Sequence, residues 1–193
     1  MKLKRNICVL FVVLLSAFQF TGCEFEGSGY GTANVPPIVE QWRSLVEHYA
    51  EEYGIPEYVD LILAMIMQES GGNAEQTPDI MQCSESAGMS PNAIDDPEVS
   101  IRQGVKYLAS LVRSGEAAGV DRATVIQSYN FGGGYISFIA ENGGKHSEEL
   151  ARQYSASMAS RYGWSSYGDV KYVEHVYSHM NFDSAAAGEG YEA

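Results

Sequence analysis

The sequence predicts a single domain that is mainly α-helical, with little or no β-sheet. Two observations support this prediction. Apolar residues recur at helical spacing through most of residues 38–180, and Asp, Ser or Pro stands where several of these segments begin. The chain has 193 residues, enough for one well-buried domain, and no internal repeat indicates a second copy of a module.

The most apolar of these segments is Val59–Ser70 (VDLILAMIMQES). With one exception, residues 59–67 are apolar, which predicts a helix buried on all sides. Pro56 suits a first helical turn, and Gly71-Gly72 permits the left-handed conformation in which helices end. Glu69 therefore lies in the last turn, where burial and the negative end of the helix dipole both raise the pKa of a carboxyl group. Such a group suits a general acid, whereas a solvated helix-end carboxylate is the alternative.

The other elements follow from the same criteria. Residues 38–53 carry an apolar stripe, which predicts a surface helix. Residues 71–96 are rich in Gly, Pro, Asn and Ser, which predicts a long loop on the substrate side or a short hairpin around 79–82. Further helices are expected from Pro97 to about Arg113 after an Asp96 cap, from Asp121 to about Phe131 with a continuation after three glycines to Glu141, from Glu148 to Tyr162 after a Ser147 cap, and from an Asp169 cap to about Met180.

The N-terminal region carries an export signal. Residues 1–22 combine three basic residues with an apolar run, which is typical of a secretory signal peptide; an uncleaved anchor is the alternative, although the run is short for a spanning helix. Cys23 follows Phe20-Thr21-Gly22, which resembles a bacterial lipobox and implies a lipidated Cys23 in place of a free one. We expect a lipidated cysteine and flexible linker over 23–37, the folded domain over 38–180 and a disordered tail over 181–193.

Charge and cysteine content limit the possible partners. The formal net charge is −13, and removal of the signal peptide leaves nine Lys and Arg against 25 Asp and Glu, or −16. This excess of acidic residues argues against nucleic acid as a partner and against electrostatic binding to anionic lipid. Cys83 has no partner once Cys8 is cleaved off and Cys23 is lipidated, so no disulfide is expected in the mature chain.

Three short motifs follow one another: Gln68-Glu69-Ser70, Asp79-Ile80-Met81-Gln82 and Ser128-Tyr129-Asn130-Phe131-Gly132. Their order resembles that in goose-type lysozymes and soluble lytic transglycosylases, whose modules carry E-S, G-L-M-Q and A-Y-N-x-G. The resemblance is greater to the CwlT-like lysozyme-like modules of bacterial cell-wall muramidases, in which an acidic residue also replaces the Gly before the I/L-M-Q element. It covers about residues 42–180 and implies a lysozyme-like fold. The sequence shows no second, peptidase domain, so endopeptidase activity is not implied.

The resemblance also implies a role for each matching residue. Glu69 matches the catalytic acid/base, in agreement with the burial argument. Tyr129 and Asn130 match the Y-N pair, in which the phenol approaches the acid and the glycosidic oxygen. Without the resemblance, Met81 and Tyr129 would be interpreted as core residues. Substrate contacts are expected from Ser70, Asp79, Met81, Gln82, Glu85, Tyr129 and Asn130.

These roles imply a muramidase that cleaves the β-1,4 bond between N-acetylmuramic acid and N-acetylglucosamine in peptidoglycan glycan strands, with Glu69 as general acid. A lytic transglycosylase, which forms a 1,6-anhydro product without a second carboxylate, is one alternative; Asp79, as a candidate second carboxylate, favours hydrolysis. A non-catalytic glycan-binding surface lipoprotein is another. We expect a membrane-anchored protein facing the cell wall, or a secreted one if Cys23 is not lipidated. The sequence does not identify any partner in cell-wall or conjugation machinery.

Two further kinds of site are set aside. Cys83 lacks the surrounding signature of a thiol protease nucleophile. His175 and His179 are four residues apart, a spacing that can hold a metal ion, but no third ligand is evident. No metal and no cofactor is therefore expected.

Overall fold

The structure is a computed structural model that describes residues 31–182. The expected signal peptide, Cys23 and residues 183–193 of the expected tail lie outside the described residues. The elements in chain order are β1 (Thr32–Ala33), α1 (Pro37–Glu40), α2 (Arg43–Tyr53), the 3-10 turn η1 (Pro56–Tyr58), α3 (Val59–Ser70), the 3-10 turn η2 (Ser84–Ala87), α4 (Pro97–Ala118), α5 (Arg122–Phe131), α6 (Gly134–Glu141), α7 (Glu148–Tyr162), α8 (Tyr172–Tyr177) and β2 (Met180–Asn181). The predicted mainly α-helical fold class is confirmed.

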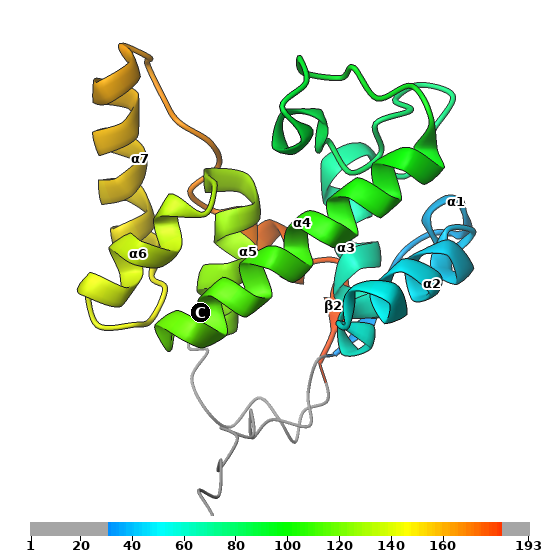
Figure 1. Cartoon of the computed structure of the whole chain (residues 1–193), viewed down its shortest axis with the longest axis horizontal. Coiled ribbons are helices and arrows are strands. Elements are labelled where there is room, and N and C mark those ends of the chain that lie inside the picture. Colours follow the sequence, from blue (N-terminus) through cyan, green and yellow to red (C-terminus); the bar gives the residue numbers. More distant parts are fainter. Residues whose placement is uncertain (1–30, 183–193) are drawn as a thin grey trace, which may run out of the picture.

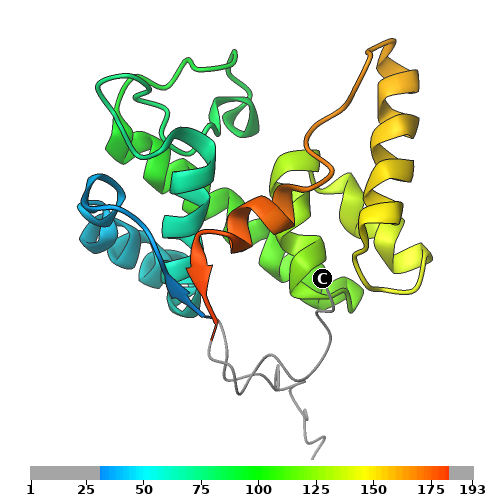
Figure 2. The ribbon, with the colours of Figure 1, turned by 180° about the vertical axis from the view of Figure 1, so that it is seen from behind.

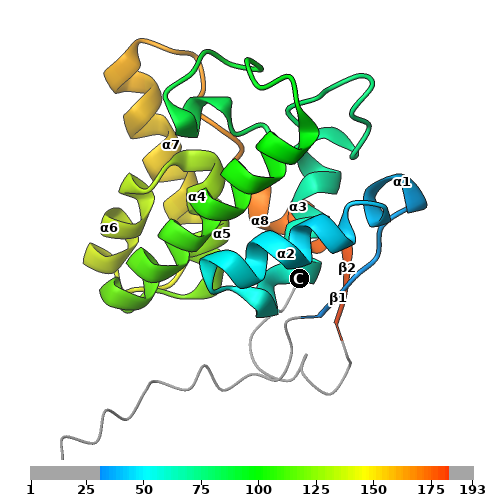
Figure 3. The ribbon, with the colours of Figure 1, turned by 45° about the vertical axis from the view of Figure 1, so that its right-hand side comes forward.

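Helix α3 packs against α2, α8 and strand β1 (Figure 3). Glu69 lies in its last turn. Residues 61–66 are buried with exposures of 2% or less, as their apolar character predicted. The helix follows η1, which Pro56 opens, and stops at Gly71, whose φ of 67° lies in the left-handed region. The prediction of a buried helix over Val59–Ser70 is confirmed.

Helix α4 links the two halves of the molecule. Figure 1 shows it crossing the front, with α2 and α3 on one side and α5 and α6 on the other. Its start is as predicted: Pro97 occupies the first turn, and the Asp96 side chain accepts a backbone N–H at 2.8 Å. The helix continues past Arg113 to Ala118 because its inner face, including the buried Gly115, packs against α5 until Gly119 takes a left-handed φ of 67°.

Helices α5, α6 and α7 form most of the other half, with α7 at its outer edge (Figure 2). The predicted cap at Ser147 is confirmed, since its side chain accepts the N–H of Leu150 at 3.2 Å. Asp121, where a helix was expected to begin, caps α5 by accepting the N–H of Thr124 at 3.0 Å. Gly132, with φ 82° and ψ 159°, turns the chain between α5 and α6, as the glycine run predicted.

The N-terminal part of the domain differs from the prediction. The helix expected over 38–53 is divided into α1 and α2 at a turn, where the Trp42 indole donates to the carbonyl of Gly72 at 2.9 Å. Strand β1 lies inside the segment expected to be a flexible linker, and it pairs antiparallel with β2, Thr32 opposite Asn181. The folded part of the chain therefore begins before Ile38.

The last helix is shorter than predicted, because α8 starts only at Tyr172. The backbone of Asp169 is already bonded elsewhere: its N–H donates to Asn130 Oδ1 at 2.7 Å, and its carbonyl accepts from Gln127 Nε2 at 2.7 Å. These bonds hold residues 169–171 in a turn that precedes the helix.

Residues 71–96 form the predicted long loop, with η2 inside it and no hairpin around residues 79–82. This loop and helix α7 stand on opposite sides of the upper edge in Figure 1. Between residues 31 and 182, no helix is both long enough and apolar enough to cross a membrane.

Candidate active site

Glu69 is a half-buried carboxyl group whose pKa is raised to about 7. Burial is the largest cause, because it removes water that would stabilise the charged form. A hydrogen bond from Tyr172, whose hydroxyl donates to Oε1 at 2.5 Å, acts in the opposite direction and lowers the pKa. The negative charges of Asp79 and Asp169 raise it further. A carboxyl group with this pKa is still about half protonated at neutral pH.

Asp79 is more deeply buried than Glu69 but stays ionised. Its side chain is only 1% exposed, and burial alone would raise its pKa. The backbone N–H groups of Cys83 and Ser84 donate to it at 3.1 and 3.0 Å, and the hydroxyls of Ser84 and Ser100 donate at 2.6 and 2.7 Å. These donors outweigh the burial, so the pKa is lowered.

The position of Asp79 corrects the expectation that it contacts substrate. Both carboxylate oxygens accept hydrogen bonds from the protein, and almost none of the side chain reaches the surface. Ser84 also accepts the N–H of Ile94 at 3.0 Å, and Ser100 that of Met81 at 3.0 Å. Asp79 therefore fixes the loop to the first turn of α4 and supplies a permanent negative charge near Glu69.

Three other expected contact residues hold the loop in place. Ser70 Oγ donates to the carbonyl of Ile80 at 2.8 Å, which ties the end of α3 to the loop. Met81 is fully buried against Gly104 of α4, so its side chain does not line a subsite as expected. The Tyr129 hydroxyl donates to the carbonyl of Met81 at 3.0 Å and does not bond to Glu69.

Gln82 and Glu85 are the two expected contact residues of the loop that keep polar groups open to a ligand. Gln82 is half-buried and has φ 47°, a left-handed conformation that is uncommon for a residue other than glycine. Both hydrogen bonds of its side chain leave from Nε2, to the carbonyl of Asp79 at 2.8 Å and to Asn92 Oδ1 at 2.9 Å. The amide oxygen is thus left for another donor. Glu85 is exposed on η2.

Asn130 joins the end of α5 to the segment before α8. Its Oδ1 accepts the N–H of Asp169, and Gly168 lies so close that a Cβ there would be 2.6 Å from the same oxygen. Asp169 Oδ2 lies 2.6 Å from Nδ1 of His175. Asn130 therefore places a second charged group near Glu69.

Tyr172 is the site residue that the sequence did not reveal. Its ring is 2% exposed and its hydroxyl donates to Glu69, 103 residues away in the chain. A tyrosine in an apolar helical pattern normally indicates core packing, and nothing local distinguishes this one. Its place next to Val173 in a predicted helix was the only available signal.

The Cys83 thiol and the His175 ring each lie next to a carboxylate group. Burial and the charge of Asp79 raise the pKa of the Cys83 thiol to about 12, so it is protonated and unreactive at neutral pH. His175 is paired with Asp169. Within residues 31–182, no three His, Cys, Asp or Glu side chains are arranged to hold a metal ion.

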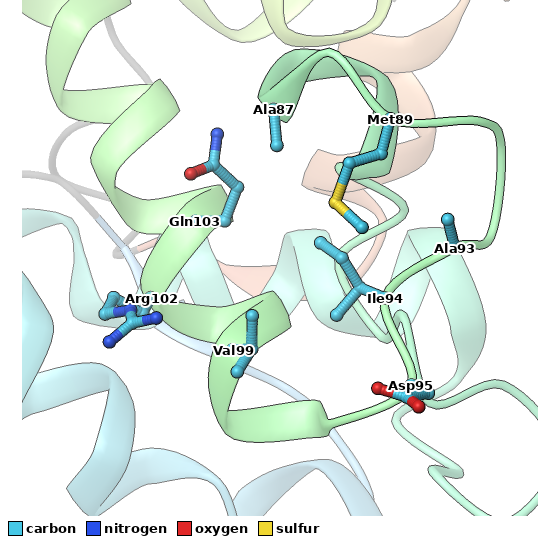
Figure 4. Close-up of a pocket in the computed structure, with 8 residues that line it drawn as sticks. All are labelled: Ala87, Met89, Ala93, Ile94, Asp95, Val99, Arg102 and Gln103. Atoms are coloured by element: carbon cyan, nitrogen blue, oxygen red, sulfur yellow. The ribbon is translucent and has the colours of Figure 1, made fainter.

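A pocket of about 150 Å³ lies elsewhere, between the η2 loop and the start of α4 (Figure 4). Its lining is mostly apolar and includes none of the residues of the Glu69 site: Ala87, Met89, Ala93, Ile94, Asp95, Val99, Arg102 and Gln103. The Glu69 group is therefore the candidate active site on chemical grounds.

Comparison with known proteins supports the resemblance. Residues 37–190 match the family model described as Lysozyme-like. The chain is 42% identical over 173 residues to the bifunctional muramidase/DL-endopeptidase CwlT of Bacillus subtilis strain 168, covering 88% of this chain and 51% of CwlT. It is 39% identical over 147 residues to pneumococcal vaccine antigen A of Streptococcus pneumoniae serotype 4, covering 75% of this chain and 67% of that protein.

A solved structure gives the same picture. A crystal structure from Staphylococcus aureus subsp. aureus Mu50, of a protein described as similar to lipoprotein, NLP/P60 family, superposes with a TM-score of 0.71 at 39% identity. The alignment covers 79% of this chain and 55% of that one. The chain thus spans about half the length of CwlT and of the staphylococcal protein. The match to most of the described domain, together with these relatives, shows that the chain belongs to the lysozyme-like family.

Proposed function

We propose that this protein is a glycosidase that cuts peptidoglycan glycan strands, at the β-1,4 bond between N-acetylmuramic acid and N-acetylglucosamine, with Glu69 as general acid. The observation that carries the proposal is a half-buried carboxyl group with a pKa of about 7 at the end of a buried helix. A general acid works best when its pKa is close to the working pH. The muramidase named among the relatives supports the choice of substrate.

The contacts of Glu69 suggest how the proton is held and used. Oε1 accepts the hydrogen bond from Tyr172, so the acidic proton belongs on Oε2, from which it passes to the glycosidic oxygen. As the proton leaves, negative charge develops on the carboxylate, and the Tyr172 hydroxyl stabilises it. The same carboxylate is then placed to accept a proton from whatever attacks the oxocarbenium-like sugar.

Two ways of completing the reaction are open to such a site. In hydrolysis, water attacks, usually with the help of a second carboxylate. The relationship to a muramidase favours this route, and Asp169 or the exposed Glu85 would then be the second group. In transglycosylation, the 6-hydroxyl of the sugar attacks and one carboxyl group suffices. The enclosure of Asp79 by four donors favours this second candidate, because Asp79 cannot assist.

The remaining residues divide into two groups in this proposal. Gln82 and Asn130 bind sugar hydroxyl or acetamido groups, since each has an amide group that the protein does not fully use. Glu85 borders the substrate from η2. In contrast, Ser70, Asp79, Met81 and Tyr129 fix the loop from which Gln82 projects.

Digestion of purified peptidoglycan tests the proposal. Glu69→Gln keeps the size of the side chain but cannot donate the proton, and we expect it to release soluble fragments roughly 10² to 10⁴-fold more slowly than the wild type. Glu116→Gln, at an exposed position near the end of α4, serves as the control. Equal release by the wild type and Glu69→Gln would reject Glu69 as the acid. No release by either would reject the enzyme and leave a non-catalytic glycan-binding protein.

Mass spectrometry of the released fragments then separates the two routes. A reducing N-acetylmuramic acid end indicates hydrolysis by water. A 1,6-anhydro end, lighter by one water, indicates transglycosylation.

We also propose that the protein is exported and held at the membrane by a lipid on Cys23. Relatives named as a membrane protein of Bacillus subtilis and as similar to lipoprotein in Staphylococcus aureus support this placement. Metabolic labelling with a fatty acid tests it: label should enter the wild type and not Cys23→Ser. Equal labelling of both would exclude this anchor.

A further inference from the structure

Three aromatic side chains near the end of α7 form an exposed surface, which we call the aromatic ledge: Tyr162, Trp164 and Tyr167. Their ring centroids lie 5.0 to 6.0 Å apart, and their planes are within 29° of one another. Trp164 is 59% exposed and Tyr162 is 50% exposed, while Tyr167 is half-buried. The three rings therefore stack on one another, and the two most exposed, Tyr162 and Trp164, are largely open to solvent.

The ledge is held rigidly by backbone contacts. Gly163 ends α7 with a left-handed φ of 70°, and the N–H of Trp164 donates to the carbonyl of Ala159 at 2.9 Å. The carbonyl of Tyr167 accepts from Ser155 Oγ at 2.6 Å, and its hydroxyl donates to the carbonyl of Phe131 at 2.8 Å. A surface fixed in this way loses little conformational entropy when a ligand covers it.

The ledge is continuous with the Glu69 site. Tyr167 is followed by Gly168, which packs against Asn130, and by Asp169, whose charge acts on Glu69. In Figure 2 this segment descends from the outer end of α7 to the centre of the molecule, where α8 begins. On the opposite side, the charge of Glu85 on η2 contributes to the raised pKa of Tyr167, after burial and Tyr162. Tyr167 of the ledge is therefore within electrostatic range of the loop that carries Gln82.

The chemistry of the ledge fits a sugar ring. Exposed apolar surface rimmed by polar groups usually marks a binding site, and here exposed Ser165 and Ser166 adjoin the rings. A β-1,4-linked pyranose has its hydroxyl groups around the equator and an apolar face of C–H groups, which lies flat on an aromatic ring. Tyr and Trp add a polar edge that can bond the equatorial hydroxyls.

We propose that the aromatic ledge is a subsite for an N-acetylhexosamine ring of the glycan strand, away from the bond that is cut. This inference rests on the proposed function, since the strand is the ligand that Glu69 would act on. It makes a distinct claim about chain length: only strands long enough to reach from Glu69 to the ledge gain affinity from it.

The test uses the full chain carrying Glu69→Gln, so that the ligand is bound and not consumed. Peptide-free glycan strands of four, six and eight sugars are titrated by calorimetry into this protein with and without Trp164→Ala. We expect affinity to rise with length in the parent, and Trp164→Ala to weaken binding of the longest strand about tenfold. Trp164→Phe, which keeps an aromatic face, should retain at least half of the affinity.

The pocket in Figure 4 supplies the control. Met89 lines that pocket and is 46% exposed, so Met89→Ala removes a comparably exposed apolar side chain. It should leave the affinity for every strand unchanged. Unchanged affinity in Trp164→Ala, or a loss in Met89→Ala of the same size, would overturn the ledge. Trp164 is one of two tryptophans, and a blue shift of its emission on strand binding would support the contact.

Failure of this inference is distinguishable from failure of the proposed function. If Glu69→Gln abolishes digestion while the addition of Trp164→Ala to it leaves the affinity for long strands unchanged, the ledge is rejected and the acid stands. If Trp164→Ala weakens binding while Glu69→Gln digests normally, the subsite stands and the acid is rejected.

Discussion

Asp79 and Glu69 are two carboxyl groups of the same site that are both shielded from water, but their pKa values shift in opposite directions. Asp79 receives four hydrogen bonds from backbone and hydroxyl donors, and its pKa is lowered although the side chain is 1% exposed. Glu69 keeps more access to solvent but, among residues 31–182, accepts a hydrogen bond only from Tyr172, and its pKa rises to about 7. The number of donors, and not the depth of burial, decides which group holds a proton.

The difference assigns separate tasks to the two groups. Asp79 is a permanent anion that organises the loop, and its charge makes Glu69 harder to ionise. Glu69 accepts few hydrogen bonds, which lowers the stability of the folded protein. For the same reason the group is still partly protonated at neutral pH and can donate that proton. The raised pKa of Glu69 therefore depends in part on Asp79, which stays ionised at neutral pH.

Removing the charge of Asp79 should have the largest effect. Asp79→Asn places an NH₂ group among donors, so several of them lose their acceptor, and we expect a loss of about 3 to 5 kcal/mol in unfolding free energy. Without the anion, the pKa of Glu69 should also fall. Denaturant unfolding and the pH dependence of digestion measure both effects. Asp95→Asn, at an exposed position, is the control; if it destabilises as much, the hydrogen bonds of Asp79 are not the cause.

The second largest expected effect is the loss of folding stability that results from ionising the half-buried Glu69. Because the folded state raises the pKa from 4.5 to about 7, the unfolded chain ionises first as pH rises, and stability falls between these values. Glu69→Gln should therefore stabilise the protein by up to about 3 kcal/mol at pH 8 and by little at pH 4. Thermal unfolding at both pH values measures this. A gain of equal size at pH 4 and pH 8 would show that ionisation is not responsible.

Much of the fold could be predicted where the signals are local. Asp96 and Pro97 mark the start of α4, Ser147 marks that of α7, and the apolar run of α3 ends at Gly71, all as predicted. The boundaries that differed depend on bonds between distant residues. The bonds of Asp169 to Asn130 and Gln127 delay α8, and the pairing of the two short strands orders part of the expected linker.

The candidate site likewise contains residues that local sequence pattern could predict and residues that depend on contacts between distant parts of the chain. Glu69 could be singled out because an apolar helix surrounds it in the sequence. The loop over 71–96 has no periodicity, so the sequence could not tell that Asp79 and Met81 point inward while Gln82 does not. Tyr172 was missed because its contact with Glu69 exists only in the folded chain. Local pattern therefore singled out Glu69 as the candidate acid, and the fold was needed to find the groups that contact it.

The smallest expected effect comes from removing a single tyrosine hydroxyl group near Glu69. Tyr172→Phe removes a donor that favours the ionised form of Glu69, so the pKa of Glu69 should rise, and loss of digestion at alkaline pH should begin at a higher pH. Tyr129→Phe removes another buried hydroxyl, which donates to the carbonyl of Met81 instead. It should cost about 1 kcal/mol of stability and leave the pH profile in place. If both variants shift the pH profile by the same amount, the hydrogen bond from Tyr172 does not set the pKa of Glu69. The assignment of the acidic proton to Oε2 would then be wrong as well.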